Sequence, residues 1–203
     1  MLSGEVRLRG DVGIKVKRAP KAPWSWRLRN WLRLPFIVGW LGWILGHAYM
    51  RTFGAPVLLG RLEARLIKRD GSVINYGTLG FRVVTTAFVT FLTDQLQTET
   101  SVFGDFKYHD SGVGTTAEAN GDTGIETTDG ESRATGTQTE ASATAYRSVG
   151  TISYTTTKAI TEHGLFNDAT TGTLMDRTVF SAVNVVNGDS IQFTYTLTAS
   201  AGG

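Results

Sequence analysis

The feature that most constrains this chain is an uncharged run at residues 34–50, which includes the apolar segment PFIVGWLGWILG. As a helix, its 17 residues would rise about 25 Å, less than the roughly 30 Å hydrocarbon core of a membrane. Pro35 and three glycines weaken such a helix, and Arg33 and Arg51 at its two ends give it no orientation. The sequence therefore disfavours a membrane span and predicts an apolar surface that packs on protein.

Charge and aromatic residues divide the chain into two parts. Residues 1–69 carry 14 Lys and Arg against 3 Asp and Glu, together with all five tryptophans. Residues 70–203 carry 6 Lys and Arg against 15 Asp and Glu. Fully burying five tryptophans corresponds to at most roughly 25 kcal/mol of transfer free energy, so this first part must pack on its own domain or on a partner.

The first part is expected to be an assembly arm, residues 1–56, attached to a domain at residues 57–203. Residues 1–23 are basic, contain prolines and lack helical periodicity, which indicates an extended arm. Residues 24–34 place Trp24, Leu28, Trp31 and Leu32 at helical spacing, which predicts a short amphipathic helix. Pro35 is expected to end or kink that helix.

The second part has the alternation and turn residues of antiparallel strands, with one expected helix at residues 83–97. Asp70-Gly71 predicts a hairpin between residues 61–66 and 72–76, and Asn187-Gly188 predicts another between residues 183–186 and 191–198. Further strands are expected at residues 106–109, 133–139, 148–156 and 173–180, and a long acidic loop at 112–130. The predicted fold class is mainly β, an antiparallel sandwich or jelly-roll-like domain.

Candidate chemistry is sparse. Glu162 and His163 are adjacent on an expected strand and would point to opposite faces, which favours a hydrogen-bonded structural histidine over an acid–base pair. The loop carboxylates lack the compact spacing of a calcium loop, which favours a solvated acidic loop. With no cysteine, the chain has no thiolate nucleophile or ligand. The sequence predicts no enzyme, no cofactor and no metal site.

The chain from about residue 79 to 203 resembles a family of tailed-bacteriophage virion proteins. The resemblance rests on VVTTAFVTFLTDQLQ (83–97), FKYHDSGVGTTAEANGDTGIET (106–127), RATGTQTE (133–140) and the C-terminal segment from residue 160 to 203. It does not extend over residues 1–50. It implies a structural component of the particle, assembled in the bacterial cytoplasm, without an enzymatic role. A β-domain with a basic aromatic arm is similar in plan to capsid cement or decoration proteins, which suggests a homo-oligomer such as a trimer.

Trp and Arg dominate interface hot spots, and here they interleave. The arm is therefore expected to dock on the major capsid protein, on other virion subunits or on sister copies. A tail or fibre component is an alternative, as is contact with nucleic acid through phosphate neutralisation and stacking, or with a membrane. The candidate interface residues are Trp24, Trp26, Arg27, Arg29, Trp31, Arg33, Phe36, Trp40 and Trp43.

Overall fold

The computed structural model describes residues 5–8, 12–15, 19–53, 57–97 and 105–200. Its three helices are α1 (Trp24–Trp31), α2 (Leu34–Phe53) and α3 (Thr86–Gln97). Its strands are β1 (Glu5–Leu8), β2 (Val12–Lys15), β3 (Val57–Ile67), β4 (Val73–Val84), β5 (Tyr108–Gly112), β6 (Ala134–Thr135), β7 (Thr137–Ser142), β8 (Ala145–Ser153), β9 (Lys158–Phe166), β10 (Leu174–Val185) and β11 (Ser190–Ser200).

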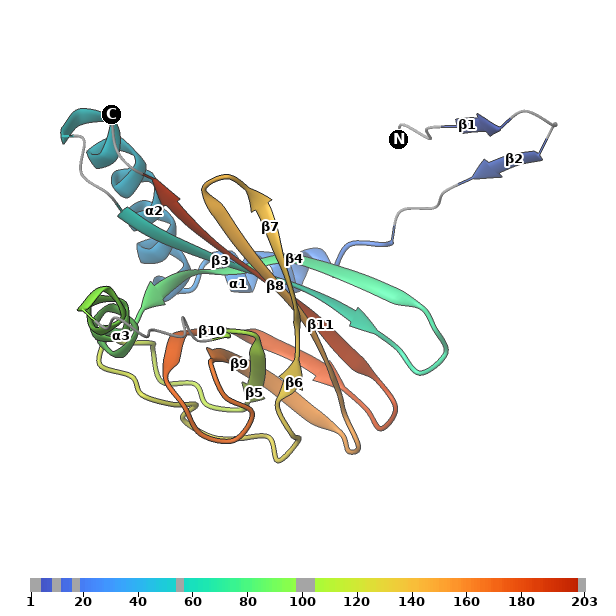
Figure 1. Ribbon diagram of the computed structural model, residues 1–203. Coiled ribbons are helices and arrows are strands. Elements are labelled where there is room, and N and C mark those ends of the chain that lie inside the picture. The colour runs from blue at the N-terminus through green and yellow to red at the C-terminus, as the bar shows by residue number, and fades with distance from the viewer. Residues whose placement is uncertain (1–4, 9–11, 16–18, 54–56, 98–104, 201–203) are drawn as a thin grey trace.

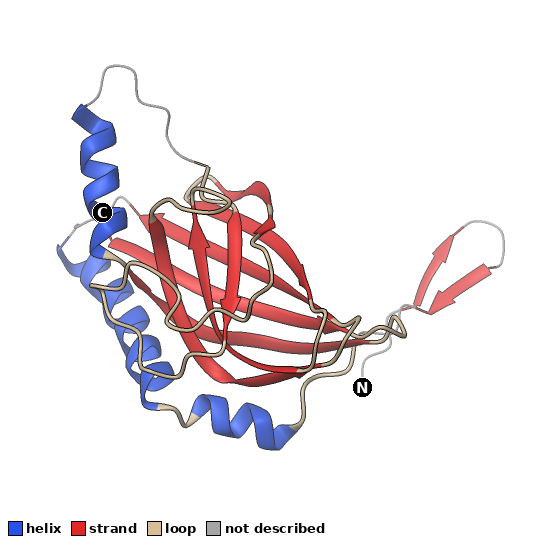
Figure 2. Cartoon of the chain, turned by 90° about the horizontal axis from the view of Figure 1, so that it is seen from below, coloured by secondary structure: helices blue, strands red, loops and turns tan. Residues whose placement is uncertain are grey.

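Two antiparallel sheets pack as a sandwich (Figures 1 and 2), which confirms the predicted mainly β class. The five-stranded sheet has the order β7-β8-β11-β3-β4, and the four-stranded sheet has the order β6-β5-β9-β10. At one corner the end of β4 pairs with β10, through Val84 with Asp176 and Val83 with Arg177. Strands β1 and β2 pair with each other and are drawn apart from the sandwich in Figure 1.

The hairpin between β3 and β4 forms where the sequence predicts it. Gly71 takes a positive φ of 79°, which a glycine adopts without steric cost. The Asp70 side chain accepts a hydrogen bond from the Ser72 backbone N–H, which closes the turn. In β11, Ile191, Phe193 and Tyr195 are fully buried, as the alternation predicts.

The predicted C-terminal hairpin is wrong, because its two strands lie in different sheets. β11 pairs with β3 and β8, whereas β10 pairs with β9 and β4. The turn around Asn187-Gly188 crosses from one sheet to the other, and buried Asp189 holds it by accepting bonds from the backbone N–H groups of Arg69 and Val186. The turn residues of a hairpin and of this crossing are the same, so local sequence does not separate them. The segments expected as two strands, 173–180 and 183–186, form the single strand β10.

The described ranges contain three helices, so the expectation of one helix in the sandwich plus a short one in the arm misses α2. Pro35 is the second residue of α2, where its missing N–H is not needed and its fixed φ suits the first turn. The predicted helix at residues 24–34 is shorter and forms α1. Helix α3 lies within the predicted range, and buried Thr85 caps it by accepting a bond from the Phe88 N–H. The expected domain boundary at residue 56 lies outside the described residues.

The buried histidines belong to the sandwich interior. His109 Nδ1 lies 2.9 Å from His163 Nε2, and His109 Nε2 lies 2.8 Å from Ser148 Oγ. Gly136 and Gly150 make room for this imidazole, since a Cβ on Gly150 would lie 2.4 Å from His109 Cδ2. His163 is therefore buried and hydrogen-bonded, as predicted, whereas its purely structural role stays a prediction. Glu162 makes its bonds with a different set of residues.

The acidic loop at residues 112–130 is largely exposed, as expected, but it is also tied to the sheet. Glu162 is fully buried and accepts bonds from the backbone N–H groups of Gly114, Glu126 and Thr127. Arg177 Nε donates to Glu162 at 2.7 Å, and its other nitrogens lie 3.1 Å from Asp122 and Glu126. Burial disfavours the Arg177 charge, but the hydrogen bonds to Glu162 and Asp122 outweigh it and raise the pKa of Arg177.

Replacing Glu162 with Gln tests this anchor. The change keeps the side-chain size but leaves the buried guanidinium of Arg177 without its closest charge partner, so we expect unfolding free energy to fall by about 2–4 kcal/mol in urea titrations. Glu63→Gln is the matched control, because its pair with Arg61 is long, at 3.5 Å, and both side chains are exposed. The control should change by less than about 1 kcal/mol. Equal losses in the two variants would contradict the anchor.

Candidate protein-interaction face on the first two helices

Helix α1 fills a seam between the two sheets. The backbones of β4 and β10 pair at their corner only through residues 83–84 and 176–177, and α1 contacts both strands beyond it. Trp26 is buried here, and its indole Nε1 lies 2.8 Å from the Ala182 carbonyl oxygen and 3.1 Å from that of Ser181. The indole also packs edge-on against the Tyr76 ring, with centroids 4.6 Å apart. Burial in this contact raises the pKa of the Tyr76 hydroxyl.

Asn30 completes the seam by bonding to both sheets. Its Nδ2 donates to the Leu79 carbonyl of β4 at 2.8 Å, and its Oδ1 accepts from the Ser181 N–H of β10 at 2.9 Å. The side chain is buried, so these two bonds satisfy backbone groups that water does not reach. An amide side chain here replaces the missing strand-to-strand hydrogen bonds.

This arrangement decides which side of α1 faces the sandwich, a point that the sequence analysis left open. The predicted apolar stripe faces away from the sheets: Trp24 is 70% exposed, Trp31 54% and Leu32 56%. The buried positions are instead Trp26 and Asn30, one turn apart. Leu28 is exposed as well.

Helix α2 packs on the sandwich through a narrow strip. A Cβ added to Gly39 would lie 2.9 Å from the Phe81 carbonyl oxygen, so glycine allows the helix to approach β4 closely. The rings of Phe36 and Trp43 each lie 5.6 Å from the Phe81 ring, centroid to centroid. In Figure 2 the first two helices follow one another around the outside of the sandwich.

Several apolar side chains of α2 are exposed. Leu34 is 72% exposed, and Trp40 is 41% exposed. We call the exposed apolar side chains of residues 24–45 the helical face, and they are Trp24, Leu28, Trp31, Leu32, Leu34, Val38, Trp40, Leu41, Ile44 and Leu45. Among the described residues, no helix is sufficiently long and apolar to span a bilayer.

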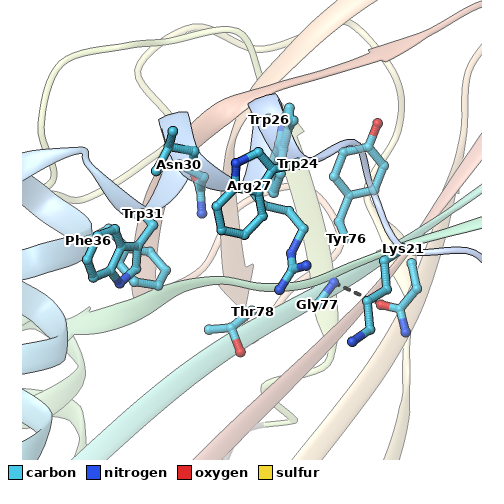
Figure 3. A pocket seen from close by; sticks show the side chains of 12 residues that line it. Lys21, Trp24, Trp26, Arg27, Asn30, Trp31, Phe36, Tyr76, Gly77 and Thr78 are labelled. Atoms are coloured by element: carbon cyan, nitrogen blue, oxygen red, sulfur yellow. Dashed lines mark hydrogen bonds between the residues drawn. The ribbon is translucent and has the colours of Figure 1, made fainter. Parts of the chain in front are cut away.

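A groove of about 350 Å³ lies between α1 and β4 (Figure 3). Trp24, Trp31 and Phe36 supply its aromatic rim, and its cations are Lys21 and Arg27. Figure 3 shows the Arg27 side chain directed from α1 toward β4 around Gly77 and Thr78. A wider hollow of about 510 Å³ lies between α2 and the sheet, where Val38, Gly42 and Trp43 face Phe81.

The nine candidate interface residues separate into three groups. Trp24, Arg27, Trp31 and Trp40 lie on or beside the exposed surface, and Arg29 is exposed while Arg33 is half-buried at the junction of the helices. Phe36 and Trp43 are partly covered by the sheet. Trp26 is the exception, because its indole is buried in the hydrophobic core of the sandwich.

Sequence reasoning missed Asn30, Lys21 and Tyr76. Asn30 could have been found, because it lies one turn after Trp26 on the same face of the helix. A buried amide at such a position can form hydrogen bonds with backbone groups. Lys21 and Tyr76 join the groove through tertiary structure, because Lys21 forms a parallel bridge with Asn75 on a strand more than fifty residues away. No local pattern indicates that contact.

A second polar cluster, around Asp129, holds the acidic loop in place. Ser111 Oγ donates to Asp129, and burial raises the pKa of this carboxyl in spite of that bond. Lys158 Nζ lies 2.7 Å from Glu131 Oε1, and this hydrogen bond with those from Thr155 lowers the pKa of Glu131 to about 2. No group of three or more His, Cys, Asp or Glu residues in the described ranges is placed to hold a metal ion. These contacts join the loop to β5 and β9.

Comparisons of the chain with models of protein families, with curated proteins and with solved structures give no match.

Asn30→Ala tests the seam. The substitution leaves the Leu79 carbonyl and the Ser181 N–H buried without a partner, so we expect a loss of about 2–4 kcal/mol in unfolding free energy. Arg29→Ala is the control from the same helix, because Arg29 is exposed. Its effect should stay within about 0.5 kcal/mol. A seam that tolerates alanine at Asn30 would show that α1 is not needed to join the sheets.

Gly39→Ala and Gly42→Ala test the contact between α2 and β4. Alanine at Gly39 meets backbone atoms and should cost about 1–3 kcal/mol, with a changed fluorescence of the neighbouring Trp43. Alanine at Gly42 meets nothing within 4 Å and should stabilise the helix by up to about 1 kcal/mol. The two melting temperatures should therefore move in opposite directions, and a rise in both would contradict this packing.

Proposed function

We propose that this protein is a non-enzymatic structural component of a tailed-phage particle, most specifically a capsid cement or decoration protein that binds neighbouring subunits through its helical face. The observation that carries the proposal is the outward direction of the apolar stripe of α1. A helix that buries Trp26 and Asn30 while exposing Trp24, Trp31 and Leu32 presents to water the side chains that gain most from burial.

The composition of the helical face supports a protein partner. Large exposed apolar surfaces on a folded protein mark binding sites, and ten apolar side chains of α1, α2 and the link between them are exposed. Arg27 stands over the Trp24 ring at 5.8 Å and places a cation beside an exposed indole. Trp and Arg in such positions carry most of the energy of known interfaces.

The resemblance over residues 79–203 supports the virion role and a location in the particle assembled in the bacterial cytoplasm. It does not separate head from tail, so a tail or fibre protein is the second candidate. The proposal includes the finer fold description of a jelly-roll-like sandwich. It also includes the division into an arm at residues 1–56 and a domain at residues 57–203, and a homo-oligomer on the particle.

Nucleic-acid contact has its own support in the excess of basic residues at positions 1–69.

The double variant Trp31→Ala with Trp40→Ala tests the proposal by co-sedimentation with particles that lack the protein. Loss of two exposed interface tryptophans should weaken particle binding by tenfold or more, while the melting temperature stays close to that of the parent because neither ring lies in the core.

The matched control is Val113→Ala with Val186→Ala, two exposed apolar residues outside the helices. It should bind particles like the parent. Equal binding by both double variants would overturn the assignment of the helical face as the docking surface. Binding to single-stranded DNA that falls steeply with salt, without particle binding, would favour the nucleic-acid alternative.

A further inference from the structure

A shallow hollow of about 820 Å³ lies on the β7–β8 hairpin and the end of β11. Tyr146 and Leu197 supply its largest apolar side chains. Ala143, Ala145 and Ala199 also line it, and their short side chains leave the space beside the two larger residues open. A wide, shallow and mainly apolar surface of this kind suits the side of a helix.

One carboxylate stands in this hairpin hollow. Glu140 is the only charged residue among the ten that line it. It lies on β7, whose six residues are all exposed, and no hydrogen bond or ion pair joins its side chain to another described residue. Glu140 can therefore pair with a cation of another molecule, and the hollow is selective for an apolar surface that carries positive charge.

Helix α1 presents such a surface. Its outer side exposes Trp24, Leu28 and Trp31. With 3.6 residues per turn, Arg27 and Arg29 flank this apolar stripe on its two sides. Both arginines are exposed, and neither forms an ion pair with a described residue. The outer side of α1 and the hairpin hollow are therefore complementary in both apolar character and charge.

The two surfaces lie too far apart to meet within one copy. Helix α1 is held at β4 by Asn30, and β3, β11 and β8 lie between β4 and β7 in the sheet. Four spacings between neighbouring strands correspond to about 19 Å. A contact between the outer side of α1 and the hollow must therefore join two copies of the chain.

We infer that the helical face of one copy lies in the hairpin hollow of a second copy, with Glu140 opposite Arg27 and Arg29. The inference rests on the proposed function, since it names a second copy as the subunit that the helical face contacts. Because the two surfaces differ, the contact is head-to-tail and produces a closed ring or a chain of copies.

Charge reversal in separate copies tests this contact by sedimentation velocity of the purified full-length chain. The parent should associate as its concentration rises. Arg27→Glu with Arg29→Glu makes both surfaces of a copy acidic, and Glu140→Lys makes both basic, so each variant alone should associate at least tenfold more weakly. An equimolar mixture of the two variants should restore association, because every helical face then meets a hollow of opposite charge.

Matched controls change the same charges elsewhere. Arg65→Glu with Lys68→Glu alters two exposed cations that lie outside both surfaces. Glu63→Lys alters a carboxylate whose pair with Arg61 is long, at 3.5 Å. Both controls should associate like the parent, and melting temperatures check that every variant keeps its fold.

A disulfide experiment tests the same contact without changing charge. The chain has no cysteine, so introduced thiols can react only with one another. Leu28→Cys mixed with Ala143→Cys should form a disulfide-linked heterodimer under oxidising conditions. The control is Leu28→Cys mixed with Val113→Cys, because Val113 is exposed but does not line the hollow. The control pair should link at least tenfold more slowly.

The remaining outcomes overturn the inference. A parent that stays monomeric at its highest soluble concentration would exclude the contact between copies. Reversed variants that associate like the parent, a mixture that does not restore association, or equal rates for the two cysteine pairs would exclude these surfaces. Any of these results, together with weakened particle binding by the Trp31 and Trp40 variant, would leave the proposed function intact and assign the helical face to a different subunit.

Discussion

The two sheets of this sandwich separate beyond their shared corner, and the rest of the structure depends on how that opening is filled. β4 and β10 pair through two residues each, after which their facing edges leave backbone groups to be satisfied. Asn30 bonds to both edges, and Trp26 covers two carbonyl groups of β10. Helix α1 therefore satisfies backbone groups that a neighbouring strand would otherwise satisfy. Its contacts also hold this part of the Trp- and Arg-rich region against the sandwich.

This constraint explains why so much apolar surface is exposed. An eight-residue helix that presents Trp26 and Asn30 to the seam must turn its other sides outward, and those sides carry Trp24, Leu28 and Trp31. Helix α2 follows after a short break and is held by Gly39 against Phe81. The same geometry that closes the fold thus creates the helical face and leaves the groove over Gly77 between α1 and β4. The acidic half of the chain is fixed separately, by the Glu162 and Arg177 anchor beneath its long loop.

Much of the β architecture could be predicted, because alternation and turn residues are local signals. The β3–β4 hairpin, the buried face of β11 and helix α3 follow from them directly. These local signals fail at Asn187-Gly188, where the turn forms as predicted but β10 and β11 belong to different sheets. The strands that β10 and β11 pair with are far away in sequence, so packing and not the turn decides this pairing. For the candidate site, the sequence identifies the Trp- and Arg-rich region but does not tell which side of α1 packs on the sandwich. Amphipathic spacing tells which residues share a face, but not that a single buried Asn with a Trp can hold the opposite face.

The central claim is that the helical face is covered by another subunit when the protein is in its working assembly. An electron cryo-microscopy reconstruction of the particle at side-chain resolution tests it most directly. The account predicts that Trp24, Trp31 and Trp40 lie against a neighbouring subunit while Trp26 and Asn30 keep their bonds across the seam. A reconstruction in which these three indoles face solvent, or in which the chain is not part of the particle, would contradict it.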